Sequence, residues 1–151
     1  MTVRRWMTRR LGGGDRGSAV IEFIVVGMLI TLPVFYLVIA LARLQAGAYA
    51  VTQAARESTR TYVTASSDST AVGRSRQAAR WAFEDQGFAD QGDVSISCTA
   101  SPCLTRGAVV SGIADLDVDL PFIPSFLRAV VPSAVHLHAR HAEPVDRFGA
   151  R

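Results

Sequence analysis

The chain has 151 residues and a formal net charge of +3, and 49% of its residues are hydrophobic. The charge is uneven, because residues 1–17 carry five arginines against one aspartate, whereas the other 134 residues sum to −1. The basic character therefore belongs to the N-terminus and does not indicate a nucleic-acid-binding surface, which would need a basic patch on the folded domain. Beyond residue 42 about a hundred residues remain, enough for one small domain and not for two.

An apolar segment follows the basic N-terminus. No charged residue occurs from Phe23 to Ala42, which is 20 positions. At ~1.5 Å per residue a helix of this length spans about 30 Å, the thickness of a bilayer's hydrocarbon core. We therefore predict a transmembrane segment over residues 18–42. The arginines before it predict a cytoplasmic N-terminus and an extracytoplasmic C-terminal domain.

Two other export signals remain alternatives for this segment. A cleavable secretory signal could end at Ala42 or Ala50, which close small-x-small triplets. Apolar regions of such signals are about 7–15 residues long, however, which is shorter than this one. Arg9-Arg10 resembles a twin-arginine signal only weakly. Neither alternative accounts for Glu22, a carboxylate at the start of a membrane helix, where a charge is costly.

The helix is expected to continue beyond the membrane. Five residues recur at helical spacing and form an apolar stripe, which Ser58 completes: Leu44, Ala48, Val51, Ala55 and Tyr62. The opposite face is polar: Gln45, Gln53, Arg56, Glu57 and Arg60. The pattern predicts one long helix over residues 18–63, whose second half packs against its own domain.

A second, shorter helix is expected over residues 69–86. Residues 66–69 are rich in N-capping side chains, and Gly87 suits a C-cap. The predicted apolar face consists of Val72, Ser75, Ala79, Ala82 and Phe83. Arg74, Arg76 and Arg80 lie off this face and indicate a solvated surface rather than a binding patch.

From Gly92 onward the hydrophobic period changes to two, which predicts strands over residues 92–98, 107–120 and 134–142. Residues 122–130 are apolar and suggest a helical turn against the core, and the polar tail over residues 143–151 is expected to fray. The expected fold class is α+β: a long N-terminal helix, a short second helix and a small antiparallel sheet of about three strands. Residues 64–151 would form a small extracytoplasmic domain.

Cys98 and Cys103 are the only cysteines. Outside the cytoplasm, two cysteines this close favour a disulfide that closes a tight loop. A redox-active pair would have two intervening residues instead of four, and a zinc site would need further ligands.

The remaining polar clusters do not form a recognisable catalytic or metal site. Asp115, Asp117 and Asp119 resemble the start of a calcium loop, but its later glycine and glutamate are missing. His136 and His138 share one face of the third predicted strand without an identifiable third metal ligand, so cross-strand charge pairs are the simpler interpretation. No nucleophile or phosphate-binding motif is present, and we expect neither an enzyme nor a cofactor.

The segment that begins at Gly17 resembles the class III signal of type IV pilin-like proteins. In order, it has a basic leader, Gly17, Ser18, three further residues, Glu22, Phe23 and a long apolar helix. The chain as a whole is similar to the TadE-like minor pseudopilins of the tight-adherence (Flp) pilus, actinobacterial type. The similarity includes the sequence before the apolar run, residues 53–57, the paired cysteines and residues 143–148.

This resemblance implies a specific maturation and set of partners. A prepilin peptidase would remove the leader, residues 1–17, by cutting after Gly17. Ser18 would then be the first mature residue, and Glu22 and Phe23 would set the registry of subunits in the membrane. Expected partners are other pilin or pseudopilin subunits, the pilus assembly platform and membrane lipid, with no nucleic acid. The alternative is a single-pass, membrane-anchored extracellular binding module whose leader is not cleaved.

Overall fold

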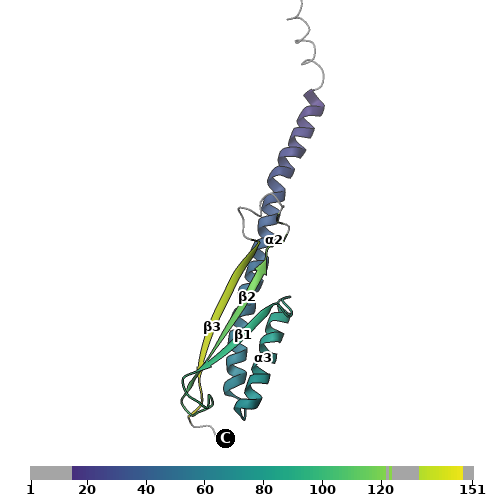
Figure 1. The fold of residues 1–151 in the computed structure, drawn as a ribbon. Coiled ribbons are helices and arrows are strands. Elements are labelled where there is room, and N and C mark those ends of the chain that lie inside the picture. The colour runs from purple at the N-terminus through teal and green to yellow at the C-terminus, as the bar shows by residue number, and fades with distance from the viewer. Residues whose placement is uncertain (1–14, 122, 124–132, 148–151) are drawn as a thin grey trace, which may run out of the picture. The chain divides into compact units, whose positions relative to one another are not determined.

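The computed structural model describes residues 15–121, 123 and 133–147. Along the chain lie α2 (Asp15–Val63), α3 (Asp68–Asp85), β1 (Gly92–Cys98), β2 (Val109–Asp119) and β3 (Ala134–Pro144) (Figure 1). The fold is α+β, with one long apolar N-terminal helix, one short helix and an antiparallel sheet, which confirms the predicted fold class. The chain divides into two compact units after Ile39. We describe each unit by itself.

The predicted long helix is present and somewhat longer than expected. α2 has 49 residues, begins at Asp15 and ends at Val63, the predicted last residue. Pro33 lies inside it without ending it. A proline removes one main-chain hydrogen bond, but apolar residues on both sides continue the helix.

The three strands form one antiparallel sheet in the order β1-β2-β3. Cys98 pairs with Val110 at one end of the β1–β2 ladder, and Leu116 pairs with both Gly92 and Leu137. On β2 every second residue from Val110 to Val118 is buried. The alternation read from the sequence is therefore confirmed.

The prediction of a frayed tail is wrong for its first residues. β3 extends through Pro144, and Val145 beyond it is only 1% exposed. The Val145 N–H donates to the Ala108 carbonyl at 2.7 Å, and the Gly107 N–H donates to the Val145 carbonyl at 3.1 Å. Val145 also packs in an apolar cluster with Tyr62. One buried valine thus holds a segment whose composition is otherwise polar.

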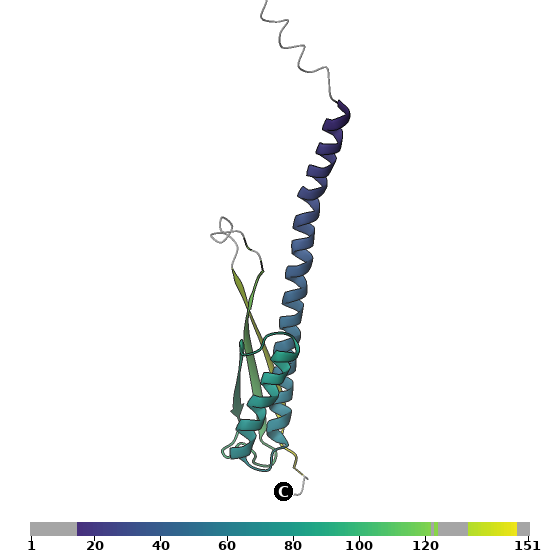
Figure 2. The same cartoon turned by 90° about the vertical axis from the view of Figure 1, so that its right-hand side faces the viewer.

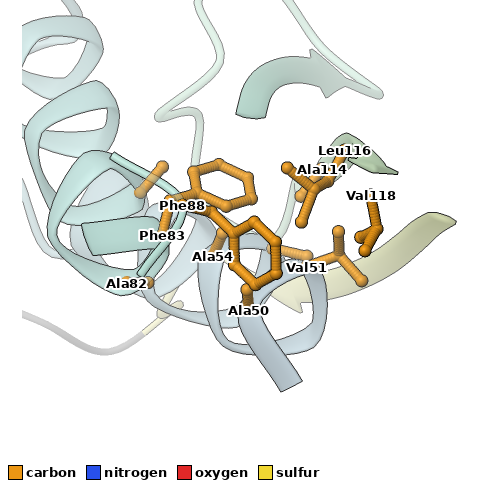
Figure 3. Close-up of a cluster of buried hydrophobic side chains, with 11 residues drawn as sticks. Ala50, Val51, Ala54, Ala82, Phe83, Phe88, Ala114, Leu116 and Val118 are labelled. Carbon is orange, nitrogen blue, oxygen red and sulfur yellow. The ribbon is translucent and has the colours of Figure 1, made fainter. Parts of the chain in front are cut away.

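Within the unit that begins at Ala40, the helices cover one face of the sheet and leave the other to solvent (Figures 1 and 2). α3 lies along β1, and the second half of α2 contacts β2 and β3. At the centre, alanines and Val51 of α2 meet Phe83, Phe88 and the inward residues of β2 (Figure 3). Small side chains on α2 let its backbone approach the sheet closely.

The buried stripe of α2 is displaced from the predicted one. Val51, Ala55 and Tyr62 are buried as expected, but Ala48 is exposed. Further buried positions of α2 were not predicted: Gly47, Ala50, Ala54 and Thr59. The buried stripe consists of adjacent pairs such as residues 50–51 and 54–55. Many of its residues are alanine, glycine or threonine, which are too weakly hydrophobic to reveal a buried face in the sequence.

The short helix has the predicted caps. The Ser67 hydroxyl accepts a hydrogen bond from the Thr70 N–H at 3.4 Å. At the other end the Phe88 N–H donates to the Phe83 carbonyl and the Gly87 N–H to the Glu84 carbonyl, both at 2.9 Å. This is a Schellman motif with Gly87 in the left-handed conformation, at φ +78°.

The predicted face of the short helix needs one correction. Ser75, Ala79, Ala82 and Phe83 are buried, but Val72 is 40% exposed and Ala71 takes its place in the core. Ala71 is fully buried and packs in the cluster that includes Tyr62 and the disulfide. The helical turn predicted over residues 122–130 lies outside the described residues, except for Ile123, which is buried.

Candidate membrane and assembly segment

The first part of α2 presents apolar side chains on all sides. Most of the large hydrophobic side chains from Val20 to Leu41 are between 47% and 79% exposed, and Phe23 is the most exposed of them. In the most apolar 18-residue stretch of this helix, no residue is buried. Among the described residues, one helix is long and apolar enough to cross a membrane. Such a surface needs lipid or other helices to cover it.

The predicted processing and registry residues all lie at the start of α2. The backbone of Gly17 and Ser18 belongs to its first turn, because the helix begins at Asp15. Ser18 and Glu22 are four residues apart, which on a helix is about one turn, or roughly 6 Å along the axis. Glu22 and Phe23 are exposed. This spacing places Ser18 and Glu22 on the same side of the helix.

Glu22 has no hydrogen-bond or ion-pair partner among the described residues. It is also the only charged residue in the sequence from Ala19 to Ala42. In a lipid environment a carboxylate without a partner is strongly penalised. A cation from outside the described part of the chain would remove that penalty.

The two cysteines form the predicted disulfide at the far end of β1. Their sulfur atoms are bonded, Cα atoms 5.3 Å apart, and both residues are half-buried. They pack against a second small core that includes Tyr62, Ala71 and Val110. The disulfide therefore fixes the β1–β2 connection to the end of α2.

Asp68 is a structural residue that the sequence did not reveal. Its carboxylate accepts hydrogen bonds from the Leu104 N–H at 3.2 Å and the Tyr62 hydroxyl at 3.4 Å. Burial raises the pKa of Tyr62, and the negative charge of Asp68 raises it further. Asp68 links the end of α2, the start of α3 and the disulfide loop. An aspartate in a capping cluster gives no sign of such a long-range contact.

The outer sheet face carries cross-strand charge pairs of the predicted kind, and they are centred on His136. Asp117 lies opposite His136, with Nδ1 to Oδ1 at 2.8 Å, and Asp115 is 3.5 Å from the other ring nitrogen. The hydrogen bond to Asp117 is the main reason that the pKa of His136 is raised. On the same face Arg140 lies opposite Ile113 and donates to the Ser111 hydroxyl at 3.3 Å.

This face offers no metal centre in the described part of the chain. Residues 15–121, 123 and 133–147 contain no group of three or more histidine, cysteine, aspartate or glutamate side chains placed to hold a metal ion. The two neighbouring histidines stack with ring centroids 6.4 Å apart. The cluster is therefore best described as a set of charge pairs on a solvated sheet face.

No family model matches the chain, and no curated protein or solved structure matches it significantly. The functional proposal therefore rests on the chain's own residues and on the resemblance that their sequence shows.

Proposed function

We propose that the protein is a TadE-like minor pseudopilin that takes part in the assembly of a tight-adherence (Flp) type IV-like pilus. In this proposal it is held in the cytoplasmic membrane by α2, with its N-terminus in the cytoplasm and its C-terminal domain outside. A prepilin peptidase processes it, and other pilin or pseudopilin subunits are its partners. Its role is structural rather than catalytic.

The single observation that carries this proposal is the composition of α2. One uninterrupted helix exposes apolar side chains in its first part, and in its second part it packs into the core of an α+β domain. A soluble core helix would be covered along its whole length. A helix that only anchors a domain has no need of Glu22 or of Gly17 five residues before it.

Cleavage after Gly17 would turn a stored membrane protein into one that can assemble. It frees an ammonium group on Ser18 and removes the net +4 of residues 1–17. The Glu22 carboxylate of an incoming subunit would then pair with the ammonium of its neighbour, as the resemblance implies. Because an unpaired charge in a low-dielectric environment costs several kcal/mol, this pairing would select one axial registry.

The test is the N-terminal sequence and intact mass of the protein from native membranes, together with an assay of pilus formation. We expect a chain that begins at Ser18. Gly17→Ala should block processing, and Glu22→Ala should leave processing intact but prevent assembly. Gly27→Ala is the matched control, because a methyl group there meets nothing within 4 Å. Normal processing and normal pili in both variants would refute the proposal.

A membrane-anchored extracellular binding module is the second candidate. It is favoured by the domain that begins at Ala40, which has its own core and its own disulfide. This candidate predicts a chain that retains its first residues in a strain with an active prepilin peptidase. It also predicts that replacing Glu22 has no effect on localisation or function.

A further inference from the structure

A groove runs between α3 and β1 on the domain that begins at Ala40. It consists of two adjoining cavities of about 340 and 450 Å³, which share Arg76, Asp93 and Val94. One cavity extends to Asp90 and Gly92, and the other extends to Tyr62 and Cys103. The groove therefore follows β1 for most of its length.

The edge of β1, rather than one of its faces, lines this groove. Four consecutive residues from Asp93 to Ile96 contribute to the lining. Successive residues of a strand point to opposite faces, so a cavity that touches all four must lie against the main chain at the strand's side. β1 is the outermost of the three described strands, and none of the described residues forms a strand on this side of it.

The hydrogen-bonding pattern of the sheet shows which main-chain groups face the groove. The Thr99 N–H donates to the Val109 carbonyl at 3.0 Å, just beyond the Cys98–Val110 pair. Hydrogen-bonded pairs alternate along an antiparallel ladder, so residues 97, 95 and 93 also turn toward β2. The N–H and C=O groups of Val94 and Ile96 therefore point to the open side.

The opposite wall is provided by α3 and is apolar with a basic rim. Ala79 and Phe83 line one cavity, and Val72 lines the other. Arg76 belongs to both cavities and has no hydrogen-bond or ion-pair partner among the described residues. Arg80 is 3.9 Å from Asp90, in a pair so exposed that it contributes little.

We propose that this groove binds an extended peptide segment as an additional strand beside β1, and that the segment carries acidic side chains. Its main chain would bond to Val94 and Ile96, as in other cases where a peptide adds to an exposed sheet edge. Residues facing α3 would place carboxylates at Arg76 and Arg80. The Asp93 side chain lies on the other face of the sheet from α3 and does not oppose them.

The groove also sets the length of the segment. Five strand residues, Gly92 to Ile96, line the two cavities. At ~3.3 Å per residue they extend over about 16 Å, which accommodates a segment of about five residues. This inference uses only residues beyond Ala40 and is independent of the proposed role in pilus assembly.

The test uses the full-length protein in detergent micelles and three synthetic pentapeptides, observed by amide NMR. The first alternates valine and glutamate, the second alternates valine and lysine, and the third is the first with alternate amides N-methylated. We expect saturable shifts at the Val94 and Ile96 amides with the glutamate peptide, and slower hydrogen exchange there. The lysine and N-methylated peptides should bind at least tenfold more weakly.

Charge reversal sharpens the test without disturbing the core, because Arg76 and Arg80 are exposed. The double variant Arg76→Glu, Arg80→Glu should reverse the preference, so that the lysine peptide binds more tightly. Arg74→Glu is the matched control, since Arg74 is exposed on the same helix but does not line the groove. It should leave the preference unchanged.

Several results would overturn the proposal. These are the absence of saturable binding by the glutamate peptide, equal binding of the N-methylated peptide, and a preference that charge reversal does not alter. Protection of the Val94 and Ile96 amides that rises with protein concentration in the absence of peptide would also overturn it. That result would assign the groove to a second copy of the chain.

Discussion

Gly112 of β2 lies directly against Thr59 of α2. A methyl group added to Gly112 would collide with the Thr59 hydroxyl oxygen and approach the Ala55 carbonyl oxygen to 3.0 Å. The Thr59 hydroxyl is itself held there, because it donates to that same carbonyl at 2.7 Å. Gly47 has the corresponding position on the helix, where an added methyl would lie 2.9 Å from Leu137. One glycine from each layer thus sets the distance between α2 and the sheet.

Gly112→Ala should therefore destabilise the domain. The new methyl group would collide with the buried Thr59 hydroxyl, which is hydrogen-bonded in place, and would crowd the Ala55 carbonyl. Overpacking of this kind costs about 1–3 kcal/mol. We expect a lower denaturation midpoint, measured by circular dichroism of the full-length protein in detergent as urea is raised.

Gly73→Ala is the control for that substitution. Gly73 is exposed on α3, and a methyl group there meets nothing within 4 Å. Since alanine favours a helix over glycine by about 1 kcal/mol, this variant should be more stable than the original. Equal stability of the Gly112 variant and the original chain would contradict the close approach of α2 and β2.

The disulfide should make a modest contribution to stability. Cys98 and Cys103 are five positions apart in the sequence. Closing so short a loop removes little entropy from the unfolded chain, so the expected loss in the double variant Cys98→Ala, Cys103→Ala is about 2 kcal/mol. Reductant should lower the urea midpoint of the original chain by a similar amount and leave that of the double variant unchanged. Sensitivity of the double variant to reductant would show that another effect is involved.

His136 should give the domain a pH-dependent stability. Its pKa is raised in the folded state, chiefly by the hydrogen bond to Asp117, so folding favours the protonated imidazole. The stabilisation is fully present below the unfolded pKa of about 6.5 and is lost as the pH rises through the higher folded pKa. We expect the urea midpoint to fall over that interval.

The origin of this pH dependence can be tested by an NMR titration of His136. Asp117→Asn should lower the pKa of His136 toward its usual value, because the principal hydrogen-bond acceptor loses its charge. Asp119→Asn should not, because Asp119 lies opposite Ala134 in the sheet. Equal effects of the two variants would point to the general charge of the outer face instead of the pair.

The sequence was informative where side chains alternate in polarity and uninformative where small residues pack. The strands were predictable because their polarity alternates regularly, and the apolar segment was predictable because no charged residue interrupts it. The helix caps at Ser67 and Gly87 were predictable because serine and glycine are typical of those positions. The buried stripe of α2 depends on Gly47, whose burial follows from contact with β2 and β3. The burial of Val145 and the bonds of Asp68 likewise depend on distant partners.

The candidate site divides in the same way. Gly17, Ser18 and Glu22 were proposed because their order and spacing resemble a class III signal, a motif that lies in one short stretch of the sequence. The disulfide was also predictable from a short separation. The groove beside β1 was not, because it forms only when α3 and an edge strand come together. The sequence suggested only that Arg76 and Arg80 are solvated. It could not show that they border the main-chain N–H and C=O groups on the open side of β1.

Arg43 is the first charged residue after the apolar run, and its guanidinium lies over the Phe88 ring, 4.2 Å from the ring centroid. The Schellman motif at Gly87 brings Phe88 to this position, where it is fully buried. Cation–π contacts of this kind are worth about 0.5–1 kcal/mol, or more where water is excluded. We expect Arg43→Gln to lower the stability of the domain by about that amount and to speed amide exchange at Phe88.

A double-mutant cycle with Phe88→Leu separates this contact from the packing of either side chain. Phe88→Leu alone should cost more than Arg43→Gln, because it also removes buried aromatic area from the core. In the Phe88→Leu background the loss caused by Arg43→Gln should disappear, which gives a coupling energy near the full value of the contact. Additive losses would mean that Arg43 acts through solvent or lipid headgroups. In that event the turn of α2 that contains Arg43 would be joined to the domain by apolar packing.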